Sequence, residues 1–129
     1  NVQAGARRSD DAAYAAFLRG SEDCLGHLMH ALEDNDPTGF MHQIEENRRL
    51  LLDLSRTSGI TIETLQLRRL VEIAQEHGAV AKSSGAGGGD CGIALCPPET
   101  NTAALCAAWE QAGIQALDLS VHVYPKVTP

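Results

Sequence analysis

The sequence predicts an α+β fold in which a small, mainly antiparallel sheet packs against helices. Two observations lead to this prediction. The first half of the chain carries apolar residues every three or four positions, which is typical of helices. The second half carries two short apolar segments around a glycine-rich loop and, at 117–123, a strict alternation of apolar and polar residues, which is typical of strands. The predicted order is helix, helix, helix, strand, strand, helix, strand.

Length and composition indicate one domain. The chain has 129 residues, of which 43% are hydrophobic, so we predict a single domain over residues 1–129 with its own core. Only 4% of the residues are aromatic, so this core must consist of aliphatic side chains. The net charge of −7 disfavours a nucleic-acid partner, because such binding depends on contacts from Lys and Arg to phosphates.

The sequence also disfavours a membrane protein and a zinc protein. No apolar run approaches the ~20 residues of a membrane helix, and no signal-peptide pattern precedes the first helix. The cysteines Cys24, Cys91, Cys96 and Cys106 form no Cys-x-x-Cys pair. We interpret them as reduced thiols of the core and expect a cytoplasmic protein without a bound metal or a membrane partner.

Capping residues mark the first two helices. Ser9 or Asp10 can cap a helix that ends near Asn35. Asp36-Pro37 then offers an N-cap followed by proline at the first helical position, and Gly59 predicts the end of this second helix. The apolar positions of the two helices are Tyr14, Phe17, Leu18, Leu25, Leu28, Met29 and Leu32, and Phe40, Met41, Ile44, Leu51 and Leu54.

Two further helices are predicted in the same way. Thr61 can cap a third helix, and Gly78 lies just past its end. Asn101 or Thr102 can cap a fourth helix, which Gly113 ends. The side chains expected to face inward are Leu67, Leu70, Val71 and Ala74 in the third helix, and Leu105, Ala108, Trp109 and Ala112 in the fourth.

The glycine-rich loop is the strongest functional signal in the chain. Glycine occupies positions 85, 87, 88, 89 and 92 between two apolar flanks that we predict to be short buried strands, 78–81 and 91–96. Because glycine adopts positive φ and lets a ligand approach the main chain, successive N–H groups of such a loop can converge on a phosphate. Ser84 adds a hydroxyl at its mouth. A flexible linker would have polar flanks, so a functional loop is the better interpretation.

The loop differs from two common phosphate-binding designs. In the P-loop the lysine follows the glycines, whereas Lys82 precedes them here. The dinucleotide-binding motif requires a helix directly after its glycines, and no helix is predicted there. Neither design therefore fits this chain.

Asn47 and Arg48 interrupt the apolar stripe of the second helix. If the stripe rotates, both side chains are solvated. If they instead line a cleft, the guanidinium of Arg48 can hold a phosphate with two hydrogen bonds. The sequence leaves both interpretations open.

The residues Gly-Ala-Val-Ala-Lys at 78–82 and Ser-Gly-Ala-Gly-Gly-Gly at 84–89 resemble the third signature motif of the GHMP kinases, the superfamily of galactokinase, homoserine kinase and mevalonate kinase. Asp90 after the glycines and Glu-Asn-Arg-Arg at 46–49 are most similar to the phosphomevalonate kinase group. The resemblance covers most of residues 9–123.

This resemblance implies a ferredoxin-like C-terminal domain of a two-domain kinase, whose N-terminal domain holds ATP and Mg²⁺ and supplies the catalytic residues. The glycine-serine loop of that N-terminal domain does not occur here, so we expect a C-terminal fragment with no catalytic residue of its own and no activity alone. The expected partners are a phosphorylated small molecule and the N-terminal domain of the same polypeptide. The residues implied for the substrate phosphate are Ser84, Gly85, Ala86, Gly87, Gly88 and Gly89. Lys82, Asp90, Asn47 and Arg48 are candidates for lining the site.

Several alternatives remain at this point. Mevalonate kinase, homoserine kinase and diphosphomevalonate decarboxylase carry similar loops. A non-catalytic module that binds a small molecule, or an interaction domain with a purely structural loop, also fits the pattern.

Overall fold

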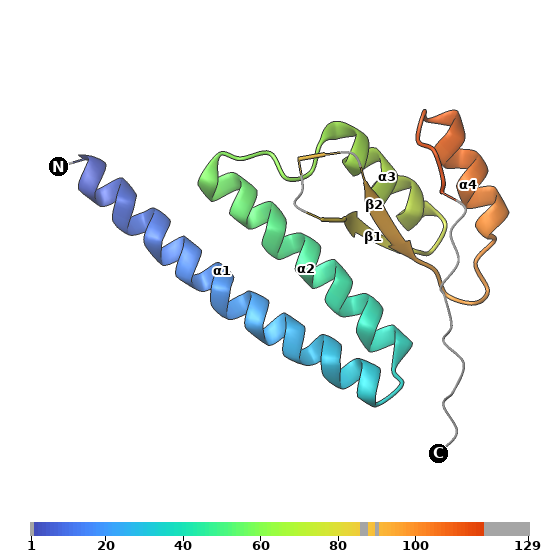
Figure 1. Ribbon diagram of the computed structural model, residues 1–129, viewed down its shortest axis with the longest axis horizontal. Coiled ribbons are helices and arrows are strands. Elements are labelled where there is room, and N and C mark those ends of the chain that lie inside the picture. Colours follow the sequence, from blue (N-terminus) through green and yellow to red (C-terminus); the bar gives the residue numbers. More distant parts are fainter. Residues whose placement is uncertain (1, 86–87, 90, 118–129) are drawn as a thin grey trace, which may run out of the picture.

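The computed structural model describes residues 2–85, 88–89 and 91–117 (Figure 1). Its elements, in chain order, are α1 (Val2–Glu33), α2 (Pro37–Ser58), α3 (Leu65–Glu76), β1 (Val80–Ser83), β2 (Gly92–Leu95) and α4 (Thr102–Gln111). The predicted α+β class is confirmed, and so is the predicted order of these six elements. The last predicted strand lies outside the described residues except for Leu117, which is exposed and belongs to an irregular segment after α4.

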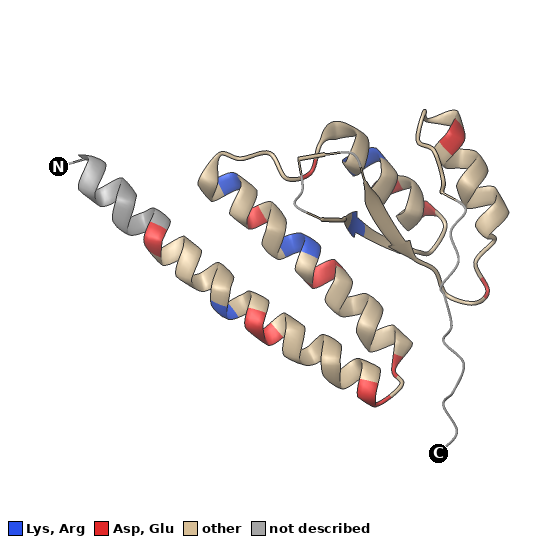
Figure 2. Cartoon of the chain, viewed as in Figure 1, with Lys and Arg blue, Asp and Glu red and all other residues tan. Residues whose placement is uncertain are grey.

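The elements are stacked in an order that follows the sequence. α1 lies along α2, α2 and α3 both contact β1, and α4 packs on α3 (Figure 1). The two strands are antiparallel, with Val80 opposite Leu95 and Ser83 opposite Gly92. The basic residues that the structure describes are spread over α1, α2, α3 and β1 (Figure 2). None of the described helices is long and apolar enough to cross a bilayer.

Local capping chemistry sets the ends of α2 and α4 as predicted. The Asp36 carboxylate accepts a hydrogen bond from the Gly39 amide at 3.0 Å, and Pro37 is the first helical residue. Gly59 closes α2 in the left-handed conformation, with φ +74°. Asn101 caps α4 by accepting from the Ala104 amide at 3.1 Å. These contacts satisfy N–H groups that have no partner inside the helix.

Two predicted helix starts were wrong. α1 begins at Val2, so Ser9 and Asp10 lie inside the helix rather than at its cap. The preceding residues include Ala4 and Ala6, which favour helix and extend it toward the N-terminus. The cap of α3 is Thr64, not Thr61, and its hydroxyl accepts from the Leu67 amide at 3.2 Å.

The core lies between α3, β1 and α4. Its buried residues are Leu67, Leu70, Val71, Ile73, Ala74, Ala79, Ala81, Leu105 and Ile114, and Ala108, Trp109 and Ala112 pack against it. All the predicted inward-facing residues of the third and fourth helices are therefore confirmed. The predicted burial of both strands holds only for β1, because β2 is half-buried and Ile93 is 43% exposed.

The cysteines are free, as predicted, but not all of them belong to the core. Cys24 is buried, Cys96 and Cys106 are half-buried, and Cys91 is exposed. Cys91 lies between the glycine-rich loop and the start of β2, and no described element covers its side chain. Burial raises the pKa of the thiols of Cys24 and Cys96 above their ordinary value.

Candidate functional site

The glycine-rich loop connects the two strands of an antiparallel hairpin. The Ser84 amide donates to the Cys91 carbonyl at 3.0 Å, directly beyond the last ladder pair of Ser83 and Gly92. This bond closes the loop at its base, so its ends are fixed on a sheet that packs against two helices. Ser84 itself is exposed. The hairpin therefore presents the loop from a rigid base, as a binding loop requires.

Two described glycines of the loop have backbone conformations that favour glycine. Gly85 has φ +78°, and apart from its chain neighbours no atom of the described residues lies within 4 Å of the position that a Cβ would take. Gly88 has φ +68°, and a Cβ there would lie 3.0 Å from the carbonyl oxygen of Thr61. Gly85 is thus open to an approaching ligand, whereas Gly88 is packed closely against the connection between α2 and α3.

A main-chain hydrogen bond joins the loop to that connection. The Gly88 amide donates to the Ile62 carbonyl at 2.7 Å. The amides of Ser84 and Gly88 thus both donate to main-chain carbonyls of the protein. The loop is consequently held both at its base and at one point along its length.

Arg48 binds a carboxylate of the same connection. Its Nε and Nη2 atoms donate to the two carboxylate oxygens of Glu63, at 2.8 and 2.9 Å. The side chain of Glu63 is only 5% exposed and that of Arg48 is 22% exposed, so the pair is largely removed from water. The hydrogen bonds that Arg48 donates to Glu63 raise the pKa of Arg48. Neither interpretation of Arg48 from the sequence included this carboxylate. Asn47, its neighbour, is half-buried.

Lys82 lies on β1 immediately before the loop. It is half-buried, and its Nζ donates to the Ser83 carbonyl at 2.7 Å. Burial lowers the pKa of this ammonium group below its ordinary value, and Cys24 acts in the opposite direction. A lysine with these properties is not the simple solvated charge expected at a strand edge.

The structure describes only some of the other predicted site residues. Gly89 is half-buried, and Ala86, Gly87 and Asp90 lie outside the described residues. The structure brings Ser84, Gly85 and Gly88 together in one loop. It also links that loop, through residues 61–63, to Arg48 on α2.

Sequence reasoning did not find the residues that make this link. Glu63 and Ile62 lie in a short connection without a repeating pattern, and Glu63 is 15 positions from its partner Arg48. The only signal in the sequence was the polar interruption of the apolar stripe at Arg48. That interruption fitted either a solvated guanidinium or one that binds a phosphate, and it pointed to no partner inside the protein.

A groove elsewhere on the surface is a separate feature. It has a volume of about 650 Å³ and lies beside the start of β1, the first turn of α2 and the segment 97–99. None of the described site residues lines it. Within the described part of the chain, no group of three or more His, Cys, Asp and Glu side chains is arranged to hold a metal ion.

Comparison with known proteins agrees with the motif. Residues 13–115 match the family model described as GHMP kinases C terminal. The chain is 38% identical over 111 residues to the phosphomevalonate kinase of Streptomyces sp. (strain CL190). The aligned region covers 84% of this chain and 30% of that protein.

Solved structures of similar proteins also superpose on this chain. A Lin0012 protein from Listeria innocua superposes with a TM-score of 0.81 at 35% identity, over 87% of this chain and 32% of that one. Phosphomevalonate kinase of Streptococcus pneumoniae, solved in complex with phosphomevalonate and AMPPNP, superposes with a TM-score of 0.71 at 41% identity, over 81% of this chain and 30% of that one. This chain thus spans about a third of the length of these relatives.

The family model covers most of the chain, and the hairpin with its glycine-rich loop lies inside the matched range. The relatives and the solved structures agree with it in sequence and in fold. The chain therefore belongs to the GHMP kinase C-terminal domain family.

Proposed function

We propose that this chain is the acceptor-binding C-terminal portion of a phosphomevalonate kinase, which transfers a phosphoryl group from ATP to 5-phosphomevalonate and releases ADP and 5-diphosphomevalonate. The observation that carries the proposal is the loop after β1, which is exposed at Ser84 and Gly85 and fixed at its base. The similarity to phosphomevalonate kinases from two organisms supports this choice of acceptor.

In this reaction an oxygen of the acceptor phosphate forms a bond to the γ-phosphorus, and the bond from that phosphorus to the leaving ADP oxygen breaks. Catalysis of such a transfer consists mainly of positioning and charge stabilisation. The loop would contribute by holding the acceptor phosphate with the Ser84 hydroxyl and main-chain N–H groups, among them the amide of Gly85. A phosphate held in this way keeps one oxygen directed toward the donor.

The nucleotide and Mg²⁺ would be held elsewhere in the full-length enzyme. The described residues of this chain include no carboxylate cluster suited to Mg²⁺. We therefore assign no step of the reaction to a metal ligand of this chain. We also propose that the 129-residue chain alone releases no ADP from Mg-ATP, with or without phosphomevalonate.

The test uses the full-length kinase with Mg-ATP and three separate acceptors: phosphomevalonate, mevalonate and homoserine. We expect ADP release with phosphomevalonate only. Turnover of one of the other two acceptors would assign the chain to a different GHMP enzyme. ADP release by the isolated chain at the rate of the full-length enzyme would refute its proposed inactivity.

A substitution tests the loop directly. Ser84→Ala should raise the KM for phosphomevalonate about tenfold, because one hydrogen bond to a charged phosphate is lost. The KM for ATP should stay unchanged. Thr38→Ala is the matched control, since it removes an exposed hydroxyl from the first turn of α2. Equal KM values for phosphomevalonate in both variants would exclude Ser84 from the site.

A further inference from the structure

The connection between α2 and α3 touches the glycine-rich loop at two consecutive residues. The Ile62 carbonyl accepts the Gly88 amide hydrogen at 2.7 Å. The carbonyl of Thr61 lies where a side chain at position 88 would have to fit. Any movement of residues 61–62 must therefore move the loop, or break this bond and open a gap beside Gly88.

The next residue, Glu63, anchors the connection to α2. Both of its carboxylate oxygens accept hydrogen bonds from Arg48, and its side chain is only 5% exposed. A two-bond contact between a guanidinium and a carboxylate fixes direction as well as distance. Because the hydrogen-bonded residues Ile62 and Glu63 are adjacent, this geometry extends from α2 to the loop.

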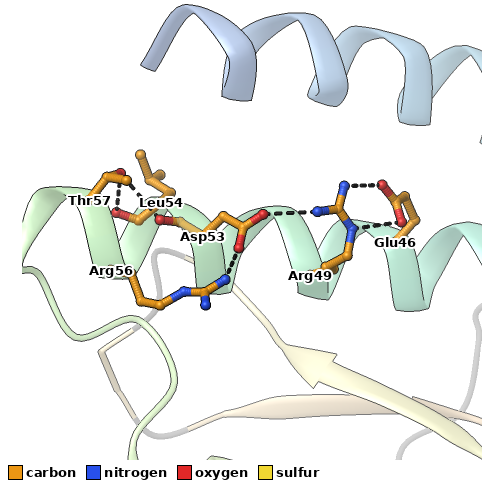
Figure 3. A network of polar contacts seen from close by, with 6 residues as sticks. All are labelled: Glu46, Arg49, Asp53, Leu54, Arg56 and Thr57. Carbon is orange, nitrogen blue, oxygen red and sulfur yellow. Dashed lines mark hydrogen bonds and ion pairs between the residues drawn. The ribbon is translucent and has the colours of Figure 1, made fainter. Parts of the chain in front are cut away.

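Arg49, the next residue on α2, makes a different kind of contact. It pairs with Glu46 and Asp53 on its own helix, and Asp53 also pairs with Arg56 (Figure 3). These side chains are between 37% and 77% exposed, and their contacts join neighbouring turns of one helix. Among the described side chains, these ion pairs join residues of α2 only. The two neighbouring arginines therefore provide a matched comparison.

We propose that Arg48 and Glu63 are a positioning pair that sets the place of the glycine-rich loop through the main chain of residues 61–63. Arg48 acts on the substrate only through Glu63, the Ile62 carbonyl and the Gly88 amide, and it does not touch the acceptor phosphate. The proposal rests on the proposed function, in which this loop binds that phosphate. It assigns to Arg48 a role different from direct binding of the phosphate.

The test measures steady-state kinetics of the full-length kinase in four variants: Arg48→Met, Glu63→Gln, both together, and Arg49→Met as the control. A positioning role predicts that each single change raises the KM for phosphomevalonate about tenfold, the effect of losing one charged hydrogen bond at the displaced loop. The KM for ATP should change less than about twofold, and the control should equal the unchanged enzyme in both values.

The double variant tests whether the two residues act as a unit. Because the pair acts as a unit, the double variant should have a KM for phosphomevalonate no higher than the worse single variant. It leaves no unpaired buried charge, so it remains informative where a single variant folds poorly. A double variant with the KM of the unchanged enzyme would overturn the proposal.

Direct binding of the phosphate by Arg48 gives another result. Glu63→Gln would then release the guanidinium and leave the KM for phosphomevalonate unchanged or lower, while Arg48→Met would raise it. This pattern also overturns the proposal. A purely structural pair would lower thermal stability in both single variants without changing either KM, which overturns it as well.

Hydrogen exchange keeps the proposal testable where the full-length protein does not act on phosphomevalonate. In that case the proposed function fails, and exchange in the peptide that contains Gly88 decides the role of the pair. We expect about tenfold faster exchange of the Gly88 amide in Glu63→Gln than in Arg49→Met, because its hydrogen bond opens more often. Equal exchange in these two variants would show that the pair does not hold the loop.

Discussion

Gly88 is subject to two constraints at once, a positive φ and a carbonyl oxygen beside its α-carbon. Gly85 shares the first constraint, but beyond its chain neighbours no described residue lies within 4 Å of the place where a Cβ would be. The left-handed conformation costs an ordinary residue about 1–2 kcal/mol, and crowding of a packed contact adds about 1–3 kcal/mol. The two positions in one loop therefore separate backbone strain from steric conflict.

We expect Gly85→Ala to lower the free energy of unfolding by about 1–2 kcal/mol and Gly88→Ala to lower it by about 1–3 kcal/mol more. Urea denaturation of both variants, monitored by circular dichroism, measures the difference. Equal values for the two variants would mean that the connection at Thr61 yields to the added methyl group. In that case the loop would not be held where the structure has it.

The sequence predicts residue-level features best where their cause is local. The caps at Asp36 and Asn101 and the turn at Gly59 follow from the chemistry of neighbouring residues, so their positions could be predicted. The bond between Arg48 and Glu63 could not be predicted, because it joins two elements whose relative position depends on the whole fold. For the same reason, neither interpretation of Arg48 from the sequence, solvated or bound to a phosphate, included the protein partner that this guanidinium has.

At the scale of elements, Thr64 rather than Thr61 caps α3, although both residues can cap a helix. Tertiary contacts of residues 61–63 with Gly88 and Arg48 decide between them, since these contacts keep the connection out of the helix. The hairpin, by contrast, could be predicted from its apolar flanks and glycines. The partial exposure of β2 could not be predicted, because the burial of a strand depends on the helices that pack on it.

Trp109 connects α4 to α3 at this same scale. Its indole Nε1 donates to the Leu70 carbonyl at 3.1 Å, and its ring packs on the core cluster. Trp109→Phe keeps most of the apolar contact but removes the donor, so we expect a loss of about 1 kcal/mol of unfolding free energy. Trp109→Ala removes both and should cost about 3–5 kcal/mol. Equal losses in urea denaturation would show that the hydrogen bond, not the ring packing, holds α4.

At the scale of the whole molecule, stability is distributed unevenly over the layers. The core cluster joins α3, β1 and α4, whereas α1 packs chiefly along α2 and has only Cys24 and Ala31 buried among its described side chains. Several large apolar side chains of α1 are instead exposed: Tyr14, Leu18, Leu25, Met29 and Leu32. Sequence periodicity predicted these residues as one stripe, but a stripe does not reveal whether another element covers it.

Hydrogen exchange of the 129-residue chain tests this uneven distribution. A helix with few buried contacts opens locally at a lower free energy than one inside the core. We therefore expect the amides of α1 to exchange at least about tenfold faster than those of α3, although α1 is the longer helix, 32 residues against 12. The buried face of α1 around Cys24, which lies against α2 and donates to the Gln43 carbonyl at 3.3 Å, should be its slowest part. Equal protection of α1 and α3 would contradict this expectation, because it would mean that the whole stack unfolds as one cooperative unit in spite of the few buried side chains of α1.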